Sequence, residues 1–215
     1  MPLQQVNVIA PPNVSIADGL QPTMLGGKSG EGIVAELHGK WYSATYRNRV
    51  FEVASLTAGT LIPAIVNTVV ATFAVWNPLG SGVNMELISY DAVMVQGTTT
   101  VVSDVSLWFQ TGVGVTTGVP TNLTTLSIKN ANLAGSGASQ VQAYASASLV
   151  TTTALMFKSV NLWGPTNITN SGTLSNRYEF DGKVIVPPGV LVFTAGFAAQ
   201  SSLASQFMSW AEWPI

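Results

Sequence analysis

The sequence predicts an all-β protein, an antiparallel β-sandwich or jelly roll with an extended N-terminal arm. Short apolar or alternating runs recur along most of the chain, turns rich in glycine, proline and asparagine separate them, and no convincing amphipathic helix is visible. Regular short strands with such turns are typical of closed antiparallel folds. We expect the arm to occupy residues 1–50 and the sandwich to occupy residues 51–215.

The predicted arm differs in composition from the rest of the chain. Eight of the 18 charged residues lie between Asp18 and Glu52, and the chain beyond them is nearly neutral. Residues 1–25 contain four prolines and no sustained period of 2 or 3.6 residues, which is typical of an extended segment. A helix near residues 33–47 is the alternative, but Gly39 and the β-branched residues weaken it.

The predicted strands follow from periodicity and from the turns between them. Val83, Met85 and Leu87 alternate with polar residues, and the apolar phase then shifts by one residue at Ile88, which indicates a bulge. Asp181–Gly182 is a signal for a hairpin-type turn. We expect strands over residues 61–76, 83–95, 105–110, 126–128, 141–149, 156–163, 177–180, 184–186, 190–193 and 206–213.

The stretch KVIVPPGVLVF, residues 183–193, raises the question of what covers its second face. Val184–Val186 and Val190–Phe193 are apolar at every position, whereas a strand with one face in water alternates. Pro188 and Gly189 suit a type II turn, in which glycine supplies the positive φ. We expect one face of the second run to meet the sandwich core and the other to approach a neighbouring copy of the protein.

The composition limits the possible partners. Charged residues make up 8% of the chain, against ~25% in ordinary soluble domains. The surface of a protein with so few charges either enters a membrane, is covered by other protein, or is made of uncharged polar residues. The apolar stretch 61–76 is shorter than the ~20 residues of a spanning helix and contains Pro63, so we expect no membrane insertion. A net charge of −2 does not favour nucleic acid.

The sequence contains few groups that suit catalysis or metal binding. There is no cysteine and only one histidine, His38; Glu31 and Glu36 lie near it and leave a weak metal site open. Glu86 and Asp91 are five residues apart, which places them on opposite faces of a regular strand unless the bulge changes this. We therefore expect no enzymatic activity and no cofactor.

Two stretches resemble virion proteins. LGGKSGEGIVAELHGKWYSATYRNRVF, residues 25–51, resembles an N-terminal block in structural proteins of tailed bacteriophages, of the form L-G-K-x-G-E…E-L-H-G-x-[WY]-Y…Y-R-x-x-x-F. Residues 182–215 resemble the closing strands of jelly-roll virion proteins, in which a PPG turn precedes a strand and the chain ends in S-W-x-E-x-P. Together the two stretches cover about a quarter of the chain.

The resemblance implies a capsid decoration (cement) protein or another virion surface protein, located on the capsid surface as a homotrimer and bound to the major capsid protein. It supplies no catalytic residues. The residues expected to contact the capsid or a sister subunit through the arm are Leu25, Lys28, Glu31, Ile33, Leu37, His38, Trp41, Tyr42 and Tyr46. Those expected at the oligomer interface are Leu191, Phe193, Trp210 and Trp213.

The alternative function is a receptor- or glycan-binding module of a phage fibre or spike. Loops rich in threonine, glycine and asparagine, at 111–125 and 164–176, would then carry recognition together with Trp163. The six tryptophans permit sugar stacking, but we favour core packing or a subunit interface as their role, because tryptophan is enriched at interfaces.

Overall fold

The computed structural model describes residues 25–26, 32–33, 39–55, 59–64, 70–96, 103–115, 118–148, 154–163, 175–197 and 203–215. The chain divides into two compact units, Met1–Tyr42 and Ser43–Ile215. In the first unit, Leu25–Gly26 pairs antiparallel with Gly32–Ile33, and the Lys40 ammonium lies 4.9 Å from the centroid of the Trp41 ring.

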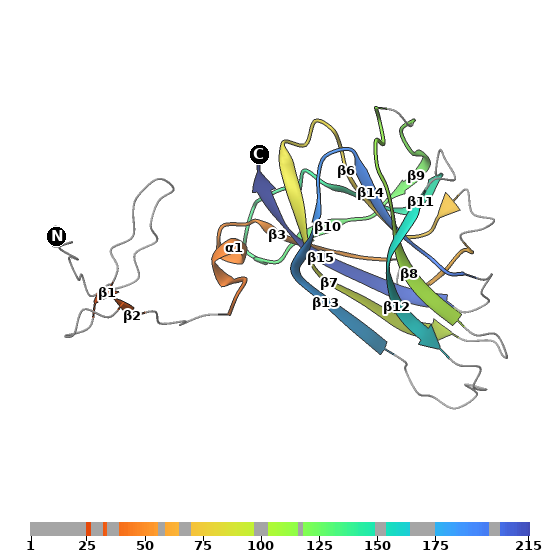
Figure 1. Cartoon of the computed structure of the whole chain (residues 1–215), viewed down its shortest axis with the longest axis horizontal. Coiled ribbons are helices and arrows are strands. Elements are labelled where there is room, and N and C mark those ends of the chain that lie inside the picture. Colours follow the sequence, from red (N-terminus) through yellow and green to blue (C-terminus); the bar gives the residue numbers. More distant parts are fainter. Residues whose placement is uncertain are drawn as a thin grey trace. The chain divides into compact units, whose positions relative to one another are not determined.

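The described part of the chain is almost entirely β-structure (Figure 1). Its elements are β1 (Leu25–Gly26), β2 (Gly32–Ile33), α1 (Tyr42–Tyr46), β3 (Val50–Ala54), β4 (Thr60–Leu61), β5 (Val70–Ala71), β6 (Ala74–Asn77), β7 (Val83–Gln96), β8 (Ser103–Gln110), β9 (Thr121–Thr125), β10 (Ile128–Asn130), β11 (Gln142–Ser148), β12 (Leu155–Trp163), β13 (Ser175–Val186), β14 (Val190–Ala195) and β15 (Leu203–Pro214).

The second unit is a jelly roll, which confirms the predicted fold class. The first sheet has the order β10-β3-β15-β7-β13, with β4 also paired to β15, and the second has the order β12-β8-β14-β6-β11-β5, with β9 also paired to β11. Eight of these strands can be numbered 1 to 8 in chain order: β3, β6, β7, β8, β12, β13, β14 and β15. Their spatial order is then 1-8-3-6 in the first sheet and 5-4-7-2 in the second. This double Greek-key order defines a jelly roll.

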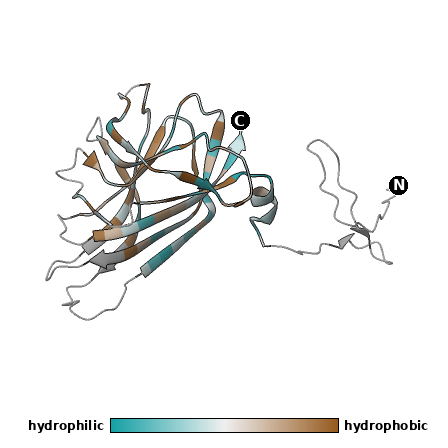
Figure 2. Ribbon diagram, turned by 180° about the vertical axis from the view of Figure 1, so that it is seen from behind, coloured by the Kyte–Doolittle hydropathy of each residue, from teal (hydrophilic) through white to brown (hydrophobic). Residues whose placement is uncertain are grey.

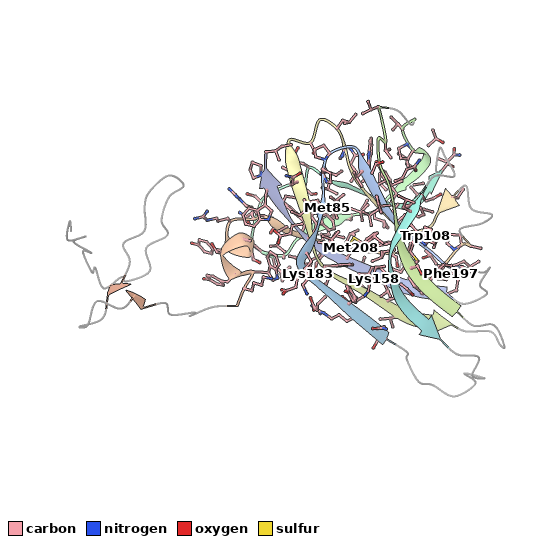
Figure 3. The ribbon with its side chains drawn as sticks, viewed as in Figure 1. Met85, Trp108, Lys158, Lys183, Phe197 and Met208 are labelled. Atoms are coloured by element: carbon pink, nitrogen blue, oxygen red, sulfur yellow. The ribbon has the colours of Figure 1, made fainter. Side chains whose placement is uncertain are left out.

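The main core lies between the two sheets. It takes alternate residues from strands of both, including Val75, Leu87, Val192 and Trp210, because successive side chains of a strand point to opposite faces. Met85 and Met208 lie in the middle of this layer (Figure 3). Burying this apolar surface is the main source of the fold's stability.

The bulge predicted in the long strand β7 is confirmed. Ser209 of β15 lies opposite Ser89 and the next residue, Trp210, lies opposite Leu87, so Ile88 is the extra residue. Leu87 and Tyr90 therefore both reach the core although three positions separate them.

The hairpin predicted at Asp181–Gly182 is wrong. These two residues have φ values of 55° and 76°, but they lie inside the continuous strand β13, at a register shift between Glu179 and Val184. Residues on both sides still pair with β7, so the chain does not reverse there. The Asp-Gly signal indicates positive φ, and here the geometry is that of a bulge.

The turn Pro187–Gly189 connects the two sheets. It leads from β13 in the first sheet to β14 in the second, and Gly189 has the predicted positive φ, 83°. Its N–H donates to the Asn77 carbonyl over 2.7 Å, and the Val113 N–H donates to the Gly189 carbonyl over 2.9 Å. The turn therefore directs β14 into the centre of the second sheet.

The second face of β14 is covered by the chain itself, not by a neighbouring copy as expected. Val190 and Val192 face the main core, whereas Leu191 and Phe193 belong to a second buried cluster with Trp76, Tyr144 and other residues of β5, β6 and β11. The strand lies between β8 and β6, so both of its edges are paired as well. Nearby on this sheet, the rings of Trp108 and Phe197 meet edge-on, with centroids 6.1 Å apart (Figure 3).

Two further expectations need correction. The stretch 61–76 is not one strand, because β4 ends at Leu61 and the chain bends at residues 72–73 before β6; residues 65–69 lie outside the described part. The segment 1–50, predicted to be extended, contains the short helix α1, on which Ala44 is buried.

Candidate binding surfaces

The outer face of the first sheet gathers charged side chains in a protein that has few of them. The strand registers place one row of residues across five strands: Lys129 opposite Glu52, Glu52 opposite Ser209, Ser209 opposite Ser89, and Ser89 opposite Glu179. Figure 2 shows hydrophilic stretches in teal on the strands of this sheet. The alternate residues of the same strands point into the core.

A second row on this face centres on an aromatic side chain. Phe207 lies opposite Ala54 on one side and Asp91 on the other, and Asp91 lies opposite Arg177. The Phe207 side chain is 42% exposed although it sits on an interior strand of the sheet. An exposed aromatic ring beside a polar side chain is a common component of ligand-binding surfaces.

The two rows form the floor of a hollow of ≈ 910 Å³, which we call the outer groove. Thr125, the last residue of β9, and Leu126 and Ser127, which join β9 to β10, also line it. The full lining is Glu52, Val53, Ala54, Ser55, Ser89, Asp91, Val93, Thr125, Leu126, Ser127, Lys129, Arg177, Phe207, Met208 and Ser209. This volume lies within the ~300–1,000 Å³ range of small-molecule sites.

The polar groups of the outer groove are largely matched to one another. The hydroxyl oxygens of Ser89 and Ser209 lie 2.8 Å apart in a hydrogen bond. The Arg177 guanidinium donates to the Glu179 carboxylate, and its Nε lies 3.8 Å from Asp91 Oδ1. Burial raises the pKa of Asp91 above its ordinary 3.8; Arg177 opposes this shift and Glu179 adds to it.

The bulge in β7 brings Glu86 and Asp91 to the same face. Met85, Leu87, Tyr90 and Ala92 point into the core, so the residues beside them, Glu86 and Asp91, both point outward. The two acids do not form a pair, because Glu86 accepts a hydrogen bond from Trp213 Nε1 and Asp91 faces Arg177. The opposite-face geometry of a regular strand therefore does not apply here.

A second surface lies where the end strands of the two sheets approach each other. The order of each sheet leaves β12 and β13 paired on one side only among the described residues. Between them opens an apolar cleft of ≈ 430 Å³, which we call the edge cleft. Its lining is Phe109, Thr111, Phe157, Lys183, Val184, Ile185, Val186, Pro187, Val190 and Val192.

Side-chain contacts close the space between β12 and β13 further along the strands. Asn176 Nδ2 donates to the Val160 carbonyl over 3.1 Å, and the Lys158 ammonium lies 4.2 Å from the centroid of the Tyr178 ring. Figure 3 shows Lys158 and Lys183 on this side of the molecule. The edge cleft therefore opens only beyond the β13 bulge, where Val184 replaces the larger Phe180 as the inward residue.

Apolar side chains project into solvent around the edge cleft. Ile185 on β13 is 61% exposed, and Leu155 and Met156 at the start of β12 are 62% and 42% exposed. Single exposed apolar residues are ordinary, but here they flank an opening into the core.

The residues expected at the oligomer interface lie mainly in the interior. Leu191, Phe193 and Trp210 are 0% exposed within one chain, so the expectation that they contact a neighbour is wrong for these side chains. Trp213 is half-buried; its ring lies 5.4 Å from the Arg49 guanidinium and its Nε1 donates to Glu86.

The C-terminal S-W-x-E-x-P pattern has a structural explanation. Trp210 Nε1 donates to the buried Glu212 carboxylate over 3.0 Å, and the Gln140 N–H donates to its second oxygen over 3.0 Å. Ser139 adds a further hydroxyl donor. Glu212 therefore ties the loop before β11 to the last strand.

The expected arm residues are only partly described. Leu25 and Ile33 face each other in the β1–β2 ladder. Trp41 is half-buried, and Tyr42 and Tyr46 of α1 are exposed. The predictions for Lys28, Glu31, Leu37 and His38, like those for loop residues 164–174 and the side chain of Trp163, lie outside the described residues.

Within the described ranges, no cluster of three or more His, Cys, Asp or Glu side chains could hold a metal ion, and no helix is long and apolar enough to cross a membrane. Comparison with family models, with curated proteins and with solved structures finds no match.

No local sequence pattern indicates the outer groove directly. Its floor comes from five strands that lie far apart in the chain, so their side chains meet only through the sheet register. Two local patterns indicate only which side chains point outward. Arg177 and Glu179 alternate with core residues on β13, and Phe207 occupies an outward-facing position of β15.

Proposed function

We propose that the protein is a structural virion protein that decorates a phage capsid as an oligomer, with three copies in each oligomer. The sequence resemblance supplies the virion setting. The edge cleft is the single structural observation that carries the proposal, because it exposes core residues between two strands that each have one unpaired side among the described residues.

The apolar character of the edge cleft favours a protein partner. Phe109, Phe157 and Val192 line it and also pack against or within the main core. Covering such surface stabilises an assembly by about 25 cal/mol per Å² of apolar area removed from water. A chain with only 8% charged residues has few charges to oppose this association.

The N-terminal unit supports attachment to a separate surface. It is a compact unit distinct from the jelly roll, and the charged block from Asp18 to Glu52 begins within it. In this proposal the jelly roll forms the oligomer and the N-terminal unit contacts the major capsid protein.

Reconstitution with capsids that lack the chain tests the proposal. Purified full-length protein should co-sediment with these capsids and appear as added density on their outer surface. Tyr42→Ala, at an exposed position of the N-terminal unit, should lower the occupancy, whereas Leu133→Ala, at a 95% exposed loop position of the jelly roll, should not. Failure of the full-length protein to bind such capsids would contradict the proposal.

A further inference from the structure

We propose that the outer groove is a binding site for a neutral carbohydrate chain, seated on Phe207 between Asp91 and Arg177. This inference concerns a different surface from the edge cleft and does not depend on the virion role. Its basis is the arrangement of an exposed ring, hydroxyl groups and paired charges across five neighbouring strands.

Phe207 provides the apolar platform. The ring is partly exposed, and its neighbour Ala54 is too small to cover it. A pyranose ring presents an apolar face of C–H groups that packs on an aromatic side chain and removes both from water. The short side chains of Ser89 and Ser209 beside it leave the groove floor low.

The polar groups around Phe207 suit a ligand with many hydroxyl groups. The Asp91 carboxylate accepts hydrogen bonds, the Arg177 guanidinium donates them, and the hydroxyls of Ser127, Ser89 and Ser209 do both. Hydrogen bonds to ionised groups are stronger than those between neutral groups, so Asp91 and Arg177 would fix the sugar orientation.

The charge of the groove excludes a strongly charged ligand. Glu52 lies opposite Lys129, and Asp91 lies opposite Arg177, so each of these two carboxylates has a positive neighbour in the sheet register. Glu179, which pairs with Arg177, leaves a small negative excess that opposes a polyanion. A nucleic acid or a sulfated polymer would meet no basic patch here.

The volume of the groove is that of a small-molecule site, but its extended shape suits a chain. The hollow is open and spans several strands, from Lys129 on β10 to Arg177 on β13. A linear oligosaccharide lies flat on such a face and contacts each row of residues in turn. The ligand class is therefore an extended, uncharged polysaccharide.

The test is a titration of the full-length protein with maltohexaose, cellohexaose and chitohexaose. Chemical-shift changes of the amide and side-chain NMR resonances report the binding. At least one of these neutral probes should shift resonances of Phe207, Asp91 and Arg177 at ligand concentrations up to about 10 mM. Phe207→Ala should weaken binding about ten-fold or more, and Phe207→Tyr should retain it.

Leu133→Ala is the matched control, because Leu133 is exposed and lies outside the groove lining. It should leave the affinity unchanged. The inference is overturned if no neutral probe shifts the groove resonances, if Phe207→Ala binds as well as the native chain, or if only a heparin hexasaccharide binds. Phe207 is partly exposed, so its alanine variant should stay folded, which the dispersion of the amide spectrum checks.

Discussion

At the residue scale, Asn77 and Gly189 explain how the chain crosses from one sheet to the other. Asn77 is fully buried, and its Nδ2 donates to the carbonyls of Val83 and Val186, each over 2.9 Å. The backbone carbonyl of Asn77 accepts a hydrogen bond from the Gly189 N–H. One side chain therefore joins the ends of β6, β7 and β13 at the point where the Pro187–Gly189 turn begins.

Gly189→Ala should lower the free energy of unfolding by about 1–2 kcal/mol, since a Cβ at positive φ is strained. The added Cβ would also lie 3.1 Å from Leu79 Cδ2, at a φ of 83°. Gly80→Ala is the control, because its Cβ would meet no atom within 4 Å. Chemical denaturation of both variants measures the difference, and equal stability would contradict this account of the turn.

Tyr90 anchors a buried polar network between the sheets. Its hydroxyl donates to Gln206 Oε1 over 2.9 Å, and the Gln206 N–H donates to Ser55 Oγ over 2.9 Å. Burial, and secondarily the charge of Asp91, raises the pKa of Tyr90 well above its ordinary 10.0.

The raised pKa of Tyr90 predicts a loss of stability in alkali. The unfolded chain releases the tyrosine proton near pH 10, whereas the folded chain still holds it, so stability is complete below that pH and falls as pH rises above it. Tyr90→Phe should make this decline shallower. At pH 7 it should cost about 1–3 kcal/mol, because Gln206 Oε1 loses its donor. Urea unfolding between pH 7 and 11 measures the free energy of unfolding of the native chain and of Tyr90→Phe. An equally steep decline with pH in both would contradict this account.

At the element scale, β14 and β13 show where sequence patterns succeed and fail. Both runs of KVIVPPGVLVF are apolar throughout, but burial alternates along β13, where Ile185 is exposed, and is complete along β14. An edge strand and a central strand can therefore share one composition, and only the pairing partners distinguish them. The Asp181–Gly182 bulge was missed for the same reason, since long-range pairing with β7 overrides a local turn preference.

Phe193→Ala should destabilise the chain itself by about 3–5 kcal/mol, because it leaves a cavity among Leu191, Trp76 and their neighbours. The loss should be the same at low and high protein concentration, since the side chain is covered within one chain. Denaturation at two concentrations measures it. A loss of stability that appears only at concentrations where the protein is oligomeric would show instead that Phe193 lies at an oligomer interface.

At the scale of the whole molecule, the fold class was accessible from the sequence, but the site was not. Periodic strands and turns predicted the sandwich, and the phase shift at Ile88 predicted a bulge that the sheet register confirms. The outer groove could not be predicted, because Phe207, Asp91 and Arg177 become neighbours only through the strand order β15-β7-β13. Local patterns carry strand positions, whereas sites on sheet faces depend on which strands pair.

Ile185→Lys should weaken self-association without unfolding the chain. Ile185 projects from β13 beside the edge cleft and is largely exposed, so a lysine there costs little in the monomer but is buried unfavourably in an interface. Val115→Lys, at a 66% exposed position outside the cleft lining, is the matched control and should associate like the native chain.

Assembly through the edge cleft is a claim about the molar mass of the protein in solution. Light scattering on the full-length protein at micromolar concentration should give three times the mass of one chain, and Ile185→Lys should lower this value. A native protein that stays at the mass of a single chain, or an Ile185→Lys variant that assembles as the native protein does, would contradict the claim.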